Sequence, residues 1–113
     1  MGLDSIWKCE KEVTFEPDLR LCGGVCSANG VGSFRGKVYA QIIENATDGK
    51  HSLYKEEIDN ASVREISDAL ENACYSDLVT EDSHYAVTLE ELQDLRRMFR
   101  SYAEADATLR GWW

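Results

Sequence analysis

The segment LCGGVCSANGVGSFRGKVYA, residues 21–40, lies between two parts of the chain that have different apolar patterns. Five of the eight glycines in the 113-residue chain fall in this segment. Short runs of mixed apolar and polar residues precede it, which is typical of strands, whereas apolar residues at helical spacing follow it. We therefore expect the fold to change here from an extended N-terminal third to a helical remainder.

The N-terminal third predicts a small antiparallel sheet. Residues 5–9 (SIWKC) and 12–16 (EVTFE) each mix apolar and polar side chains at strand-like spacing, so we expect them to pair. Pro17 ends this run, because proline cannot donate to a sheet ladder. Residues 19–22 (LRLC) are expected to add a short third strand before the glycines interrupt it.

Three helices are expected in the remainder. Ser33 is the expected N-cap of a helix that reaches about Ala46. Two capping boxes, Ser62 with Glu65 and Thr88 with Glu91, predict the starts of the other two helices. Strands followed by helices predict an α+β fold: a small N-terminal antiparallel hairpin or sheet followed by three helices packed on it, in one domain of residues 1–113. The expected buried stripes are Phe34, Val38 and Ile42; Val63, Ile66, Ala69, Leu70 and Ala73; and Leu89, Leu92, Leu95, Phe99 and Tyr102.

The chain is acidic, with a net charge of −9, but its charge is unevenly distributed. Residues 1–40 carry five bases and five acids, whereas residues 41–113 carry seven bases and sixteen acids. The net charge disfavours non-specific binding of nucleic acid over the whole surface. Residues 19–43, which we call the acid-free segment, contain no acid and three bases, Arg20, Arg35 and Lys37.

The start of the first expected helix predicts an anion-binding site. A glycine-rich turn that leads into a helix exposes N–H groups without intrahelical partners, and the helix dipole adds positive charge there. Hydroxyl and amide side chains, a guanidinium fork and a lysine would add contacts to phosphate. Trp7, Phe34 or Tyr39 would stack on a base. The candidate ligand-binding residues are Ser27, Asn29, Gly30, Gly32, Ser33, Phe34, Arg35, Lys37 and Tyr39.

The alternative interpretation of this stretch is a turn-rich connection whose two bases are merely solvated. The spacing excludes a Walker A loop, because Val31 stands where that motif needs glycine and Val38 where it needs Ser or Thr. The dinucleotide fingerprint, G-x-G-x-x-G, fails as well, because Gly30 and Gly32 are followed by Arg35 where the motif needs its third glycine. No nucleophile or general base is evident, so no catalytic residue is assigned and a small hydrolase is only the third alternative.

A second basic cluster, Arg96, Arg97 and Arg100, lies on the third expected helix. Arg96 and Arg100 flank its apolar stripe, where they would reach a groove that holds a ligand. The alternative is pairing with acids such as Glu104, which is the more common fate of such arginines.

Cysteines and histidines give no sign of a metal or a cofactor. Cys22 and Cys26 would seat zinc only with Cys9 and a fourth ligand, whereas structural zinc sites usually have two tight pairs. Cys74 lies on an apolar stripe and is expected in the core. The two histidines, His51 and His84, are expected at the surface.

The ends of the chain carry two further signals. Trp112 and Trp113 would anchor the tail if buried and would mark a partner surface if exposed; we expect packing, with a homo-oligomer as one way to achieve it. The N-terminus has no basic region followed by an apolar run, and no window approaches a membrane span. These patterns predict a cytoplasmic protein that does not bind membranes.

The opening MGLD, followed by a short compact chain, resembles many small uncharacterised phage and prophage proteins. The resemblance covers only those few residues and carries over no site residue. It implies a class of function, counter-defence. Some small acidic viral proteins sequester nucleotide immune signals, and others block a nucleic-acid-binding effector by acidic mimicry.

Two functions of different classes therefore remain open. The first is a binding protein that captures a phosphate-bearing small molecule, such as a cyclic or ADP-ribose-type nucleotide, through the acid-free segment. The second is an anti-CRISPR-like interaction protein whose acidic residues 41–113 occupy the basic groove of a nucleic-acid-binding defence protein. Neither requires direct binding of nucleic acid.

Overall fold

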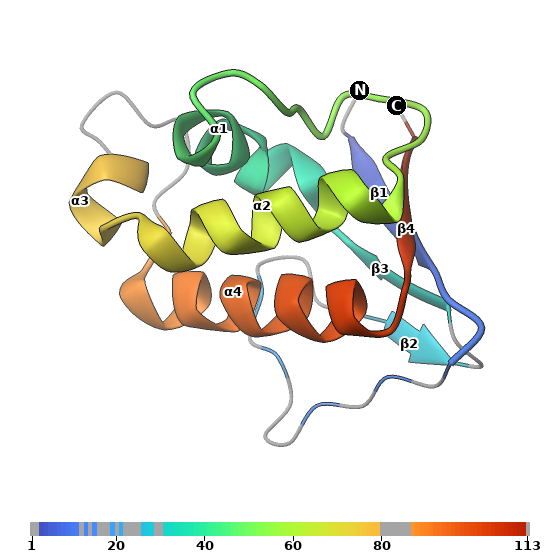
Figure 1. Cartoon of the computed structure of the whole chain (residues 1–113). Helices are drawn as coiled ribbons and strands as arrows, with labels where there is room; N and C mark the ends of the chain where they lie inside the picture. Colours follow the sequence, from blue (N-terminus) through green and yellow to red (C-terminus); the bar gives the residue numbers. More distant parts are fainter. Residues whose placement is uncertain are drawn as a thin grey trace.

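The structure is a computed structural model that describes residues 3–11, 13, 15, 19, 21, 26–28, 31–79 and 87–112; of residues 26–28 and 31 it describes the backbone only. It confirms the α+β class, with a sheet and helices packed on it (Figure 1). The elements are β1 (Asp4–Lys8), β2 (Cys26–Ala28), β3 (Val31–Phe34), α1 (Gly36–Ala46), α2 (Asn60–Asn72), α3 (Tyr75–Leu78), α4 (Leu89–Glu104) and β4 (Thr108–Trp112).

The sheet has the strand order β2-β3-β1-β4, and each neighbouring pair is antiparallel. Strand β1 is central: Trp7 lies opposite Gly32 of β3 and opposite Leu109 of β4. The prediction that residues 5–9 pair with residues 12–16 was wrong, because both edges of β1 are taken by β3 and β4. Strand-like spacing reports that a segment is extended, but not which segment it pairs with.

Strand β4 comes from the C-terminal residues, for which no strand was expected. Its outer edge is covered by the connection that precedes α2, because Ile58 and Leu109 exchange two backbone hydrogen bonds of 2.7 and 3.0 Å. The Gly111 N–H also donates to the Lys55 carbonyl at 3.1 Å. These bonds protect an edge strand that would otherwise present unpaired backbone groups to other chains.

The helices begin partly where the sequence predicts. Thr88 caps α4 as expected, because its hydroxyl accepts a hydrogen bond from the Glu91 N–H at 3.1 Å. Helix α2 starts earlier than expected, since Asp59, and not Ser62, provides the cap. The prediction of Ser33 as the N-cap of α1 was wrong, because Ser33 lies in β3. Arg35 is the N-cap, and its side chain makes no capping hydrogen bond. The short helix α3 was not predicted.

An aromatic cluster joins the sheet to α4. The Trp7 indole stacks on Tyr102 with ring centroids 4.4 Å apart and meets the edge of Phe99 at 5.1 Å. Phe34 lies 6.0 Å from the same indole. All four side chains are at most 2% exposed. The expected stripes are otherwise mostly buried, but Leu89 is 48% exposed because it is the first residue of its helix.

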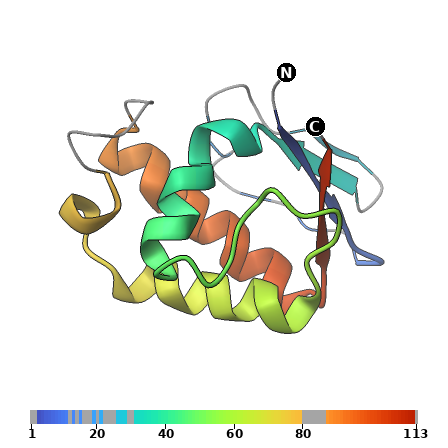
Figure 2. The same cartoon turned by 90° about the horizontal axis from the view of Figure 1, so that it is seen from above.

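The helices lie on one side of the sheet, and no described helix or strand covers the other side (Figures 1 and 2). The burial of alternate residues agrees, since the even-numbered residues of β1 and β4 are the more exposed ones. Antiparallel sheets commonly have one face on the core and one in solvent. Among the described residues, no helix combines the length and apolar character needed to cross a membrane.

Helix α1 begins in close contact with the N-terminal strand, and glycine is required there. A Cβ atom on Gly36 would overlap the Ser5 hydroxyl oxygen and lie 3.2 Å from side-chain carbons of Leu3. The Ser5 hydroxyl is fully buried and has no hydrogen-bond partner among the described residues. The helix start is therefore fixed by close packing.

We predict that Gly36→Ala lowers the free energy of unfolding by about 1–3 kcal/mol, because the added methyl group overpacks this contact. Ser5→Ala alone should be neutral or stabilising, because it removes a buried hydroxyl that lacks a partner. In the Ser5→Ala background the cost of Gly36→Ala should shrink. Chemical denaturation of the four proteins measures this, and an unchanged cost would contradict the assigned contact.

Candidate functional site

The end of β3 and the start of α1 carry the predicted anion site. Arg35 and Lys37 are exposed and lie two positions apart, and Ser33 is half-buried. Phe34 and Tyr39, in contrast, are 2% and 0% exposed and belong to the core. The two bases are thus available to a ligand, whereas neither aromatic ring offers a face on which a base would stack. Trp7 is excluded as a stacking residue for the same reason.

The glycine-rich part of the predicted site is only partly described. Asn29 and Gly30 lie outside the described residues, and of Ser27 only the backbone, in β2, is described. Gly32 is a buried residue of β3, opposite Trp7, and therefore belongs to the sheet and not to a loop. The expected glycine-rich turn before the helix was therefore wrong at Ser27 and at Gly32, because both residues lie in strands.

The helix amides are less free than the sequence suggested. The Lys37 N–H donates to the Leu3 carbonyl at 3.1 Å, and the Val38 N–H donates to the Arg35 carbonyl at 3.1 Å. Two of the N–H groups that would hold an anion at a helix start are therefore already satisfied. An anion at this position would be held mainly by the side chains of Arg35 and Lys37.

The second basic cluster is engaged within the fold. Arg96 donates to the carbonyls of Leu70 and Ala73 at 2.8 and 2.7 Å and so caps the C-terminal end of α2. Arg97 pairs with Asp94 at 2.9 Å, and Arg100 pairs with Glu71 at 2.7 Å. These are the structural roles left open as the alternative, although the carboxylate partners differ from Glu104.

Most other bases of residues 41–113 are engaged too. Lys50 pairs with Glu65 at 2.9 Å, Arg64 pairs with Asp106 at 2.9 Å, and the Arg110 guanidinium lies 5.8 Å from the Trp112 ring centroid. The acids outnumber the bases in this half, so an excess of carboxylates remains in solvent. The exposed acids include Asp48, Glu56, Glu57, Asp68 and Glu104.

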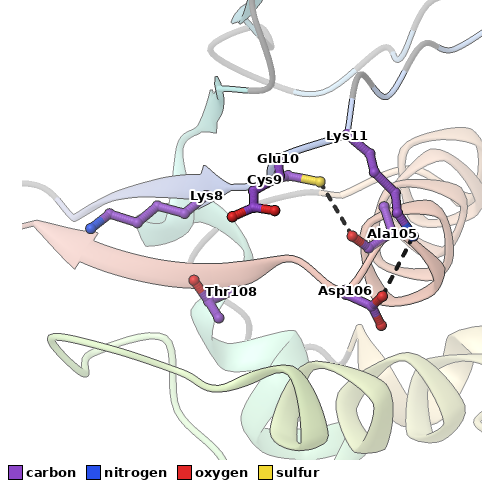
Figure 3. A pocket seen from close by; sticks show the side chains of 7 residues that line it. All are labelled: Lys8, Cys9, Glu10, Lys11, Ala105, Asp106 and Thr108. Carbon is purple, nitrogen blue, oxygen red and sulfur yellow. Dashed lines mark hydrogen bonds and ion pairs between the residues drawn. The ribbon is translucent and has the colours of Figure 1, made fainter.

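A surface hollow of about 620 Å³ lies beside the end of β1 (Figure 3). Its charges are balanced, because Lys8 and Lys11 are matched by Glu10 and Asp106. Lys11 reaches Asp106 at 3.5 Å, whereas Lys8 points away from that pair (Figure 3). The Cys9 thiol lies in the same wall and donates to the Ala105 carbonyl at 3.4 Å. The balance of charge gives this hollow no preference for an anion.

Two expectations about Cys and His side chains were wrong. Cys74 is exposed, because it is the N-cap of α3. His51 is only 8% exposed, and its Nε2 lies 2.7 Å from a Glu65 carboxylate oxygen, which ties the connection after α1 to α2. His84 lies outside the described residues. Within the described ranges, no group of three His, Cys, Asp or Glu residues would hold a metal ion.

One surface was missed by the sequence analysis. Strands β1 and β4 place Asp4, Ile6 and Lys8 beside Trp112, Arg110 and Thr108 on the uncovered side of the sheet. Trp112 is 62% exposed there, so it is not buried within the chain, and the packing expected for it across a homo-oligomer stays a prediction. Trp113 lies outside the described residues. The alternation in residues 108–112 was the signal available for this strand.

Comparison of the chain with protein-family models, with curated proteins and with solved structures gave no match. The functional interpretation therefore rests on the residues of this chain.

We predict that Arg96→Ala lowers the free energy of unfolding by about 2 kcal/mol, because two carbonyls lose a charged donor. Arg100→Ala is the matched control on the same helix. Its ion pair is largely exposed, so we expect a loss below about 1 kcal/mol. Denaturant titration of both variants measures the difference, and equal losses would argue against the capping role of Arg96.

Acid should destabilise the fold partly through Asp106. Hydrogen bonding to Arg64 and the nearby Lys11 charge hold the pKa of the Asp106 carboxyl below its usual 3.8. A lowered folded-state pKa means that this contribution is present above the unfolded-state pKa and is lost as pH falls through the folded-state pKa.

We expect Asp106→Asn to be less stable than wild type at neutral pH. The difference in melting temperature between the two proteins should narrow below about pH 4. Asparagine tolerates the positive φ of 59° at this position, so the backbone is preserved. Melting temperatures measured across this pH range check the prediction, with the exposed Glu56→Gln as control. A gap that does not change with pH would show that the Asp106 ion pairs contribute nothing.

Proposed function

We propose that this chain is a non-enzymatic binding protein that holds a phosphate-bearing small molecule, a cyclic or ADP-ribose-type nucleotide, at the surface around Arg35 and Lys37. In the setting implied by its resemblance to phage proteins, it acts in the host cytoplasm as a counter-defence factor that sequesters a nucleotide signal. The observation that carries the proposal is a pair of exposed bases in an acid-free segment of a chain with net charge −9.

The availability of these two bases supports the proposal. Arg35 and Lys37 have no ion-pair partner among the described residues, whereas most bases of residues 41–113 are engaged by carboxylates, carbonyls or an aromatic ring. A guanidinium in solvent can donate two parallel hydrogen bonds to a phosphate group, and a nearby ammonium adds a point charge. Ser33, half-buried in β3 two residues before Arg35, would add a neutral hydrogen bond.

The burial of the nearby aromatic rings limits what such a site would recognise. With Trp7, Phe34 and Tyr39 in the core, the phosphate groups and not the base would supply the main contacts. Binding through exposed charges weakens as salt rises, because interactions beyond about 8 Å are screened at physiological ionic strength. The proposed ligand therefore carries at least two phosphate groups, so that both bases contact it.

The second candidate function is acidic mimicry, and one specific observation favours it. Because the bases of residues 41–113 are largely engaged within the fold, carboxylates such as Asp68 and Glu104 dominate what this half presents to a partner. A surface of this kind would fit the basic groove of a nucleic-acid-binding defence protein. Mimicry would need these carboxylates and would not need Arg35.

We predict that Arg35→Ala weakens binding of phosphate-bearing ligands at least about tenfold, since one charge-assisted contact contributes about 1.5–3 kcal/mol. Lys37→Ala should have a smaller effect, because lysine makes a less directional contact. Calorimetric titration with ADP-ribose, a cyclic dinucleotide and pyrophosphate measures this at low salt. Lys55→Ala, another exposed base, is the matched control and should bind like wild type.

Circular dichroism and the unfolding midpoint confirm that each variant is folded. Binding by Arg35→Ala that equals wild type would remove this surface from consideration. An absence of binding by wild type across the three ligands would overturn the sequestration proposal and favour mimicry.

A further inference from the structure

The uncovered side of the sheet has an unusual combination of side chains for a solvated surface. Strand β1 presents Asp4, Ile6 and Lys8 in succession, an acid, an apolar group and a base. Strand β4 presents Trp112 next to Asp4, Arg110 next to Ile6 and Thr108 next to Lys8. Trp112 is 62% exposed, the most exposed of the described large hydrophobic side chains. We call these six residues the open sheet face.

We propose that the open sheet face is the interface of a two-fold symmetric homodimer, in which Asp4 of each copy pairs with Lys8 of the other and Trp112 of each copy enters a hollow beside Thr108 of the other. The occupant of this face is thus a second copy of the chain. Such an interface is isologous: each contact occurs twice, with the roles of the copies exchanged.

The order of charges along β1 is self-complementary. A two-fold axis that lies between two facing sheets, over Ile6 and across the strands, reverses the direction of β1. Asp4 then faces Lys8 of the second copy, Lys8 faces its Asp4, and the two Ile6 side chains meet at the centre. Sheets pack about 10 Å apart, a distance that a lysine and an aspartate together can span. Neither charge has an ion-pair partner among the described residues.

The shape of the face independently supports the same axis. Strand β4 faces strand β4 of the second copy, so the protruding Trp112 lies over the row that contains Thr108. A hollow of about 290 Å³ is present at that row, lined by Lys8, Glu56, Glu57, Thr108 and Arg110. A Trp side chain is among the best interface anchors when it fills a pocket.

The position of Arg110 is the feature least favourable to the two-fold arrangement. Arg110 lies beside Ile6 and therefore on the axis, so the arginines of the two copies approach each other. The guanidinium, however, leans toward Trp112, with 5.8 Å to the ring centroid, and this moves it off the axis in each copy. Glu56 and Glu57 line the hollow beside it and offset its charge.

A charge-swap cycle tests the pairing of Asp4 with Lys8. The variants are Asp4→Lys, Lys8→Asp and the double swap, and light scattering or sedimentation gives the dimer dissociation constant. Within one chain these residues are four positions apart, about 13 Å in a strand, which exceeds the screening length at physiological salt. Coupling between the two substitutions therefore reports contact between copies.

We expect the wild-type protein to be a dimer at a chain concentration of about 100 µM. Each single variant should associate at least about tenfold more weakly, and the double swap should recover most of the lost affinity. Trp112→Ser should also dissociate the dimer while circular dichroism shows that the chain remains folded, and Asp68→Lys on α2 is the control that should not dissociate it. A monomeric wild type would overturn the proposal, as would a double swap no stronger than the single variants. The dimer contacts do not include Arg35. The dimer proposal can therefore fail while phosphate binding succeeds, and phosphate binding can fail while the dimer forms.

Discussion

The contact on which the structure most depends is the stack between Trp7 and Tyr102, 4.4 Å apart and within 9° of parallel. Trp7 belongs to β1, the strand between β3 and β4, and Tyr102 belongs to α4. Burying one indole against this helix therefore fixes the position of the whole sheet. The alternation of the strand then sends Asp4, Ile6 and Lys8 to the opposite side. One packing contact thus determines which residues of β1 and β4 are free to meet a ligand or a partner.

Sequence patterns predicted the elements better than their pairing. Thr88 and the stripe of α4 were predictable, because a capping box and helical periodicity are local signals. The pairing of β1 with the C-terminal β4 was not, because it joins segments about a hundred residues apart, and nothing local to either specifies the partner. Ser33 was misassigned as a cap for a similar reason: its pairing with Ile6 in the sheet outweighs the local preference of serine for a helix start.

The sequence predicted which residues of the candidate site carry charge, but not which of its residues are buried. Arg35 and Lys37 are exposed, as the acid-free segment suggested, whereas Phe34 and Tyr39 are core residues. Spacing along the chain places side chains on a helix or strand, but which face is buried depends on the tertiary contacts of Trp7 and α4. The same contacts explain why the arginines of α4 serve the fold: Arg96 meets the end of α2 because the two helices pack side by side.

The central functional proposal is that the chain captures an intact phosphate-bearing molecule through Arg35 and Lys37, two exposed bases that have no ion-pair partner among the described residues. Native mass spectrometry of the purified protein, after incubation with a mixture of nucleotides at low salt, tests it most directly. We expect a complex with one or more intact nucleotides that contain at least two phosphate groups, released unchanged on denaturation. A spectrum with no bound nucleotide, or release of a cleaved product, would contradict it.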